Sequence, residues 1–215
     1  MESLIKTYGI KEFRFFDDNI SWDKKRIIEI CDEIIKRKLG IRWDTPNGVA
    51  IATLDQEVLE KMKKSGYYKI IMGIESGSET TLKFMRKPVV LNHAKEIIKI
   101  CNDLGIWTWS TFVIGFPDET KEEIQKTINF AKYSGLNFAT FYIAQPYPGT
   151  ELYHVYEKEG LLKSGFIKHR VLSYLNPTKF YSEFLKKIKS FEDLSYVFRM
   201  FLNLVKKEYS PIYKK

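Results

Sequence analysis

Cysteine is scarce in this sequence of 215 residues, which contains only Cys31 and Cys101. Two thiols so far apart form no disulfide framework, as is typical of proteins from a reducing cytoplasm. Long apolar runs are also lacking, because no segment approaches the ~20 residues needed to cross a bilayer. The amino terminus does not show the basic and then apolar order of a signal peptide. We therefore expect a cytoplasmic globular protein without a transmembrane segment.

Several common kinds of site are excluded by what is missing. There is no Walker pattern and no GxGxxG, so a glycine-rich phosphate loop is not expected. His93, His154 and His169 lack metal-ligand spacing, which argues against a zinc site. Cys31 and Cys101 each recur with apolar residues at helical spacing, and a free cysteine in that position behaves as a small hydrophobe. We therefore expect neither a catalytic nor a metal-binding cysteine.

The positive charge is concentrated at the carboxyl end. Residues 161–215 contain 12 basic and 4 acidic residues, which accounts for the whole net charge of +8. Such a segment can contact nucleic acid or a membrane surface. It can equally be the solvated face of ordinary helices, which we favour because Phe180, Phe184 and Ile188 form an apolar stripe. We divide the chain into residues 1–162 and a basic helical extension, 163–215.

Strand-like and helix-like patterns alternate before that boundary. The strand-like runs are 13–16, 41–43 or 49–51, 70–74, 107–114 and 138–144. The helix-like runs are 2–8, 23–39, 55–65, 91–104 and 120–133. This alternation predicts an α/β fold of parallel βα units with right-handed crossovers. Because a helix precedes the first strand, the pattern looks like a barrel whose first strand is missing.

Carboxylates follow two of the predicted strands. In FFDDN, Asp17, Asp18 and Asn19 come directly after a strand and can bind an ammonium group or a metal, although such residues also serve as loop and capping residues. In GIESGS, Glu75 and Ser76 end an otherwise apolar strand. A carboxylate there needs a ribose hydroxyl, a Lys or Arg partner, or a buried salt bridge to a neighbouring strand.

Glycine and proline follow the next two strands. VIGFPDET places Gly115, Phe116 and Pro117 at a strand end, a shape suited to flat contact with an aromatic base and also to a tight turn. QPYPGTELY, which contains Tyr147, has two prolines that stiffen a loop before a helix. An α/β barrel builds its active site from the carboxyl ends of successive parallel strands, so we expect these four motifs to meet there.

In this order, the four motifs resemble the radical S-adenosylmethionine (SAM) superfamily, and most closely the branch that often carries an amino-terminal cobalamin-binding domain. The resemblance covers residues 3–162. It implies a partial (β/α)6 TIM-like barrel in which CxxxCxxC, after the first strand, binds a 4Fe–4S cluster. In that family, electron transfer from the cluster cleaves SAM to methionine and a 5′-deoxyadenosyl radical.

The resemblance also implies roles for individual residues. The motif after the first visible strand would receive the SAM amino group, GIESGS the ribose, and VIGFPDET the adenine. Lys87 would contact the methionine carboxylate, with Arg86 as the alternative. The implied cofactor-binding residues are Asp17, Asp18, Asn19, Glu75, Ser76, Lys87, Gly115, Phe116, Pro117 and Tyr147.

The sequence departs from the family at the cluster. CxxxCxxC is missing, and two cysteines on separate helices cannot replace three converging thiolates. We therefore expect this chain to be the carboxyl-terminal part of a radical SAM protein that neither binds the cluster nor forms the radical by itself. The 4Fe–4S cluster, and cobalamin where it is used, would belong to the full-length parent or require a partner chain.

Three hypotheses follow from this sequence. The first is a truncated radical SAM domain that is active with its missing amino-terminal half, in a parent that methylates or rearranges a small molecule, lipid or cofactor. The second is a cluster-free partner subunit or binding module, since an unpaired strand edge recruits another chain. The third is an RNA-binding or RNA-modifying protein that uses the basic tail, and we rank this last.

Overall fold

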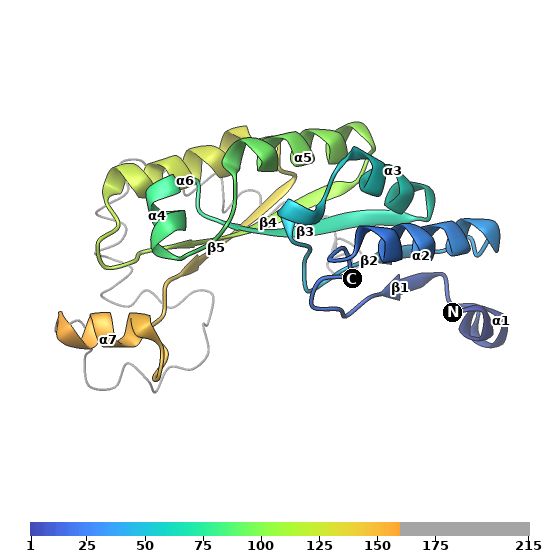
Figure 1. Cartoon of the computed structure of the whole chain (residues 1–215), viewed down its shortest axis with the longest axis horizontal. Coiled ribbons are helices and arrows are strands. Elements are labelled where there is room, and N and C mark those ends of the chain that lie inside the picture. The colour runs from blue at the N-terminus through green and yellow to red at the C-terminus, as the bar shows by residue number, and fades with distance from the viewer. Residues whose placement is uncertain (160–215) are drawn as a thin grey trace, which may run out of the picture.

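The computed structural model describes residues 1–159, which form one parallel sheet with the strand order β1-β2-β3-β4-β5 (Figure 1). Every neighbouring pair of strands is parallel, which confirms the predicted α/β class. Four predicted strands are confirmed with small shifts at their ends. Of the two alternatives for the remaining strand, 41–43 is right. The strands are β1 Glu12–Arg14, β2 Arg42–Asp44, β3 Tyr67–Glu75, β4 Trp107–Ile114 and β5 Phe138–Ile143.

The segment 49–51, the other alternative for a strand, has a different structure. Val49 forms only an isolated parallel bridge with Met72, and its amide donates to the carbonyl of Ile71 at 2.9 Å. The chain then enters the short 3-10 turn η1, Ile51–Thr53. Residues 49–51 therefore lie against β3 without extending the sheet as a sixth strand.

Helices α2, α3, α5 and α6 lie along one face of the sheet, whereas α7 lies beyond the end of β5 on the other side (Figure 1). The five predicted helices are confirmed, each to within three residues at its ends. The helix expected after the QPYPGTELY loop is α7, whereas α4 was not predicted, because it is one short segment with two consecutive threonines. The helices are α1 Glu2–Tyr8, α2 Lys24–Lys36, α3 Gln56–Lys64, α4 Glu79–Phe84, α5 Leu91–Asp103, α6 Lys121–Tyr133 and α7 Glu151–Lys158.

Local sequence signals set the helix ends. Asp23 and Asp55 accept hydrogen bonds from the backbone amides of the first turns of α2 and α3. Thr120 and Glu123 form the capping box that the sequence predicts at the start of α6. Between α3 and β3 the chain turns at Gly66, where φ is 102° and a Cβ would lie 2.0 Å from the carbonyl oxygen of Ile41. Only glycine fits there.

The hydrophobic core lies between the sheet and the covering helices. Trp43, Tyr67 and Phe112 are its largest fully buried side chains. Cys31 on α2 and Cys101 on α5 belong to the same cluster and are fully buried, which confirms their predicted role as small hydrophobes. Burial raises the pKa of the Cys101 thiol to about 12, so this sulfur stays protonated at neutral pH.

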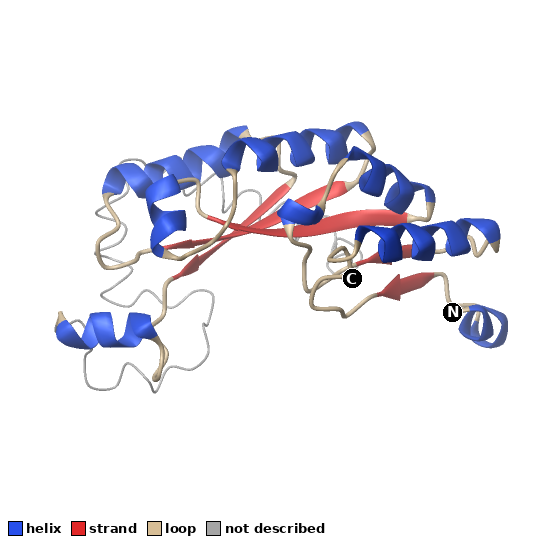
Figure 2. Cartoon of the chain, viewed as in Figure 1, coloured by secondary structure: helices blue, strands red, loops and turns tan. Residues whose placement is uncertain are grey.

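The other face of the sheet is largely free of helices within residues 1–159 (Figure 2). Along β3, fully buried Ile70, Met72 and Ile74 alternate with partly exposed side chains that face away from the core. The sheet thus presents a packed face to the helices and a second face, called here the open face.

Some expectations fall outside the described part of the chain. The domain boundary at residue 162 and the helical extension 163–215 lie among residues whose structure is not described. In residues 1–159, no helix combines the length and apolar character that a membrane span requires.

Candidate functional site

Most of the predicted site residues lie in the loops that follow β1, β3, β4 and β5, while Glu75 is the last residue of β3 and Lys87 lies between α4 and α5. Because the strands run in parallel and neighbour one another in chain order, these loops leave the same edge of the sheet (Figure 1). This carboxyl edge is where α/β sheets bind ligands.

The loop after β1 is held by its own side chains. Asp17 Oδ1 accepts a hydrogen bond from the Asn19 amide at 3.0 Å, and Asp17 Oδ2 lies 3.5 Å from Arg26 Nη2 on α2. Asn19 Oδ1 accepts from the Ala50 amide at 3.4 Å, which ties this loop to the one after β2. Asp18 is exposed and has no polar partner among residues 1–159. Asp18 is therefore the carboxylate of this loop that is not committed to a contact within residues 1–159.

Glu75 ends β3 in a strained conformation. Its φ is 69°, one of three positive values at non-glycine residues in the described chain. Its Oε1 lies 3.3 Å from Lys87 Nζ, in an ion pair that is only partly buried. Gly73 leaves room for this pair, because a Cβ there would lie 2.7 Å from Glu75 Oε1 and 3.5 Å from Lys87 Nζ. Of the partners considered for Glu75, the structure shows a lysine, and it does not come from a neighbouring strand.

The structure separates the roles of Lys87 and Arg86. The chain turns at Arg86, where φ is 55°, and the Lys87 amide donates back to the carbonyl of Leu82 at 2.9 Å. This turn directs Lys87 toward Glu75. Arg86 instead lies 2.9 Å from Glu151 at the start of α7, in an exposed pair. Of the two adjacent cations, only Lys87 faces the end of β3.

Ser76 is not exposed at the carboxyl edge, where it was predicted to contact the ligand. It is fully buried, and its hydroxyl oxygen lies 2.9 Å from Thr127 Oγ1 and accepts a hydrogen bond from the Ser78 amide at 3.0 Å. The next residue, Gly77, allows α6 to approach, since a Cβ there would lie 2.6 Å from the carbonyl oxygen of Lys126. Ser76 therefore joins the β3–α4 loop to α6, and its hydroxyl is committed to that contact.

The loop after β4 is organised by a carboxylate that the sequence reasoning did not single out. Glu119 Oε2 accepts a hydrogen bond from the Gly115 amide at 2.6 Å, and the Glu119 amide donates to the Phe116 carbonyl at 3.1 Å, which closes a turn through Pro117. Phe116 packs edge-on against Phe84 of α4, with ring centroids 5.5 Å apart. The sequence signal that could have identified Glu119 is its position four residues after Gly115, the glycine that follows β4.

Burial controls the protonation of Glu119. The side chain is nearly buried, and loss of hydration raises its pKa, while hydrogen bonds from Gly115, Phe116 and Thr81 oppose that rise. The Thr81 hydroxyl belongs to α4, so Glu119 also connects the β4 loop to the helix that follows β3.

Tyr147 lies farther out, at the mouth of the loop after β5. Its side chain is exposed, its hydroxyl donates to Gln145 Oε1 at 3.2 Å, and its carbonyl accepts from the Thr150 hydroxyl at 2.6 Å. Within residues 1–159, no polar contact joins Tyr147 to Glu75 or Asp18. The structure thus brings Glu75 and Lys87 into direct contact and places Tyr147 at the periphery.

These residues suit one kind of small molecule better than a metal cluster. The edge offers carboxylates for an ammonium group, a lysine for a carboxylate, and an aromatic ring for a flat base. Cys31 and Cys101 do not fit an iron–sulfur cluster, because both are fully buried on helices α2 and α5 and burial raises the pKa of each thiol.

Comparisons with known proteins give one consistent result. A family model described as the radical SAM superfamily matches residues 2–131. An uncharacterized methyltransferase of Pyrococcus horikoshii is 40% identical over 146 residues, which cover 68% of this chain and 31% of the relative. The cytidylyl-2-hydroxyethylphosphonate methyltransferase of Streptomyces wedmorensis is 34% identical over 162 residues, covering 72% of this chain and 30% of the relative.

A solved structure with a similar fold is the radical SAM methyltransferase TsrM from Kitasatospora setae, with cobalamin and a 4Fe–4S cluster bound. It aligns with a TM-score of 0.61 and 16% identity over 68% of this chain and 30% of TsrM. The chain spans about a third of the length of these curated relatives. The family match includes the loops after β1, β3 and β4 and ends within α6.

Proposed function

The chain belongs to the radical SAM superfamily, and from this premise we propose that it binds SAM across the carboxyl edge of its sheet. The observation that carries the proposal is the pair formed by Glu75 and Lys87 above Gly73. Backbone strain at a strand end persists only where the surroundings enforce it, and such strain clusters at ligand sites.

Each group at the edge has a part in this proposal. Lys87 holds the carboxylate of the methionine moiety, and Asp18 receives its ammonium group, with Asp17 fixing the loop. Glu75 accepts hydrogen bonds from the ribose hydroxyls. Phe116 offers a ring to the adenine, and Glu119 positions that ring through the Gly115 amide. Ser76 and Tyr147 act through the loops they stabilise.

We assign the cluster-binding cysteines to another polypeptide segment that docks beside β1. In this superfamily, the bound cluster supplies the electron that cleaves SAM. The outer edge of β1 pairs with no strand in residues 1–159, and an unpaired edge favours strand addition. The assignment rests on this edge together with the two buried cysteines, and a separately encoded amino-terminal half is one such segment.

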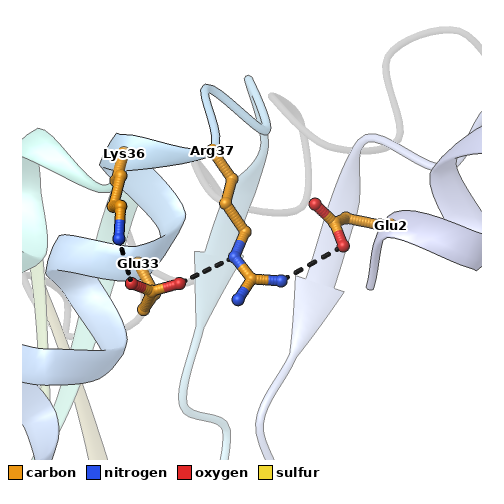
Figure 3. A network of polar contacts seen from close by, with 4 residues as sticks. All are labelled: Glu2, Glu33, Lys36 and Arg37. Carbon is orange, nitrogen blue, oxygen red and sulfur yellow. Dashed lines mark hydrogen bonds and ion pairs between the residues drawn. The ribbon is translucent and has the colours of Figure 1, made fainter.

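A groove between α1 and α2, the helices that precede and follow β1 in the chain, supports the same assignment. Helix α1 has no buried residue, and an ion pair from Glu2 to Arg37 at 3.2 Å joins it to the end of α2 (Figure 3). At this end of α2, Glu33 lies 2.7 Å from Arg37 and 3.3 Å from Lys36. The groove between the two helices measures about 420 Å³, and Ile30, Ile34 and Leu39 are among the residues that line it.

We further propose that the complete assembly transfers a methyl group. Two relatives are named methyltransferases, and the TsrM structure contains cobalamin. The other candidate is a SAM-binding subunit that never meets a cluster, which the two buried cysteines favour. Iron and sulfide analysis after anaerobic reconstitution separates the two when a partner carrying CxxxCxxC is added. We expect no stoichiometric cluster on the chain alone and a stoichiometric one with the partner.

Equilibrium dialysis with labelled SAM tests the proposed site directly. We expect Lys87→Gln to weaken binding at least about tenfold, since a lost charge-assisted contact of about 1.4 kcal/mol corresponds to that factor. The matched control is Arg86→Gln, which removes an adjacent positive charge that faces Glu151. Its affinity should stay within about twofold of the wild type. Equal affinities for all three proteins would overturn the proposal.

A further inference from the structure

A group of charged side chains lies on the open face, on β1, β2 and the first half of β3. Strand pairing places Arg14 of β1, Asp44 of β2 and Lys69 of β3 in one row across the sheet. A second row pairs Glu12 with Arg42. Strands of a parallel sheet are usually apolar on both faces, so five charges on three neighbouring strands are unusual.

Asp44 is the centre of this group. Its side chain is fully buried, with Oδ2 2.8 Å from Lys69 Nζ and Oδ1 3.6 Å from Arg14 Nε. Oδ1 has no hydrogen-bond partner among the described residues. A buried carboxylate oxygen without a hydrogen bond costs free energy, so this side chain is not explained by packing alone.

Tyr68 organises the other half of the group. Its hydroxyl donates to Glu12 Oε1 at 2.7 Å and lies 3.5 Å from Asp44 Oδ2. Burial and the Glu12 hydrogen bond raise the pKa of Tyr68 to about 12, which keeps the hydroxyl a donor at neutral pH. The guanidinium of Arg42 lies over the Tyr68 ring, 4.2 Å from its centroid. Stacking of this kind holds an arginine flat while leaving its N–H groups available.

The two arginines have guanidinium N–H donors that the carboxylates of the group do not occupy. Lys69 already pairs with Asp44, and the Tyr68 hydroxyl already donates to Glu12. Arg42 has no carboxylate partner among residues 1–159, and the Arg14 side chain is 53% exposed, with its Nε 3.6 Å from Asp44 Oδ1. A network built for stability would need one cation for each carboxylate. Here three cations face two carboxylates, which leaves one cation in surplus, and both guanidinium groups lie on the open face.

We propose that Glu12, Arg14, Arg42, Asp44, Tyr68 and Lys69, called here the β1–β3 cluster, bind a phosphoryl-type dianion carried by the substrate. Two guanidinium forks match the charge and the oxygen geometry of such a group better than those of a single carboxylate. Asp44 and Tyr68 hold the forks in place, and Asp44 Oδ1 is an acceptor for a hydroxyl on the same ligand. The proposal rests on the proposed function, because the open face leads along β3 to the SAM edge.

The position of the cluster limits the shape of the substrate. Lys69 and Glu75 are six positions apart on β3, which corresponds to about 20 Å along a strand. A ligand that reaches both Lys69 and Glu75 is therefore extended along β3, whereas Arg14 at the end of β1 lies only three positions before Asp17. Binding energy from the anionic group positions the reacting centre.

Calorimetric titration of the full chain with inorganic phosphate tests the cluster, with acetate and chloride at matched ionic strength as comparison anions. We expect phosphate to bind saturably and at least about fivefold more tightly than acetate, because it is a dianion. Arg42→Gln and Arg14→Gln should each weaken phosphate binding about tenfold, the effect of losing about 1.4 kcal/mol. Arg42→Lys, which keeps the charge but loses the fork, should weaken binding several-fold.

Lys99→Gln is the matched control, since it removes one positive charge from the outer surface of α5. It should change phosphate affinity by less than about twofold. Equal losses in Lys99→Gln and Arg42→Gln would overturn the site, and equal binding of acetate and phosphate would overturn the phosphoryl assignment. Arg42→Lys keeps the positive charge and serves as a second variant if Arg42→Gln does not fold. The denaturant midpoint of each variant shows whether it is folded.

SAM dialysis on the same variants separates this proposal from the proposed function. Arg42→Gln should leave SAM affinity within about twofold of the wild type, because Arg42 lies outside the carboxyl edge. Phosphate binding without SAM binding would overturn the proposed function alone. SAM binding without selective phosphate binding would overturn the β1–β3 cluster alone.

Discussion

The two faces of the sheet are built from the same strands and follow different rules. The helix-covered face is closed by fully buried apolar side chains such as Trp43, Met72 and Phe112. The open face carries the β1–β3 cluster at one end and partly exposed aromatic residues such as Trp109 and Phe138 on β4 and β5. Alternation along each strand sends neighbouring residues to opposite faces, so Trp43 is core while Asp44 is part of the cluster.

The contrast separates residues that stabilise the fold from residues that lower its stability at their positions. On the covered face, each side chain contributes through burial and packing. On the open face and the carboxyl edge, the chain keeps a buried carboxylate, a strained Glu75 and an unpaired Asp18. None of these is the most stable choice at its position, and such exceptions concentrate at binding sites.

The largest effect is expected on the covered face. Trp43→Ala removes a fully buried ring that packs against Tyr67 and Phe15 and donates to Ser65 Oγ at 3.0 Å. The free energy of unfolding should fall by about 3–5 kcal/mol, as for other large-to-small core substitutions. Urea denaturation followed by circular dichroism measures it.

The control for this substitution is a tryptophan that is exposed to solvent. Trp22 is 80% exposed, so Trp22→Ala should change the free energy of unfolding by less than about 0.5 kcal/mol. Similar losses in the two variants would mean that the covered face is not the source of stability.

A smaller loss is expected for a charged residue of the open face. Asp44→Asn removes the charge that Lys69 and Arg14 share, and the free energy of unfolding should fall by about 2–3 kcal/mol. This lies below the range for fully buried pairs, because the Arg14 side chain is half exposed. Asp32→Asn breaks an exposed pair with Lys61 and should cost less than about 1 kcal/mol. A loss for Asp44→Asn no larger than that control would contradict the buried role of the carboxylate.

The covered face is also the part that sequence reasoning recovered. Periodicity placed Cys31 and Cys101 in the core and gave five helices and most strand positions, because burial imposes a repeating pattern. Helix α4 was missed, since its single short stretch has no such repeat and is defined by the Ser78 cap. The choice between 41–43 and 49–51 could not be made locally, because it depends on pairing with β3.

The site was recovered less completely, for physical reasons. The loops that carry the motifs do leave one edge of the sheet, as expected of parallel strands, but the pairing of Lys87 with Glu75 depends on a turn at Arg86 that no sequence rule predicts for arginine. Ser76 was expected at the edge, yet the close approach of α6 encloses it. The β1–β3 cluster escaped notice because its members are far apart in the chain and meet only through strand register.

The pH dependence of stability gives a third test, at the carboxyl edge. Burial raises the pKa of Glu119 above its ordinary value of 4.5, so ionisation is disfavoured in the folded chain. The free energy of unfolding contributed by this group is therefore highest below pH 4.5 and falls as pH rises through the folded pKa. Relative to Glu119→Gln, the wild type should lose stability over that window, with a constant offset for the altered hydrogen bonds.

Urea titrations at a series of pH values measure this difference. Glu122→Gln, an exposed neighbour on α6, controls for the loss of one negative charge. A difference between wild type and Glu119→Gln that does not change with pH would show that the carboxylate is not destabilised by burial.

The smallest effect should also have the opposite sign. Glu75 has a φ of 69°, which glycine adopts without strain, so Glu75→Gly should raise the free energy of unfolding by up to about 1 kcal/mol. The same change removes the partner of Lys87 and should weaken SAM binding. Arg86→Gly, at a φ of 55° but facing away from Glu75, should raise stability similarly and leave SAM affinity within about twofold. If both variants gain stability and only Glu75→Gly loses SAM affinity, the strain at Glu75 is retained for binding. A loss of SAM affinity in both variants would instead mean that the turn at Arg86 is what SAM binding requires.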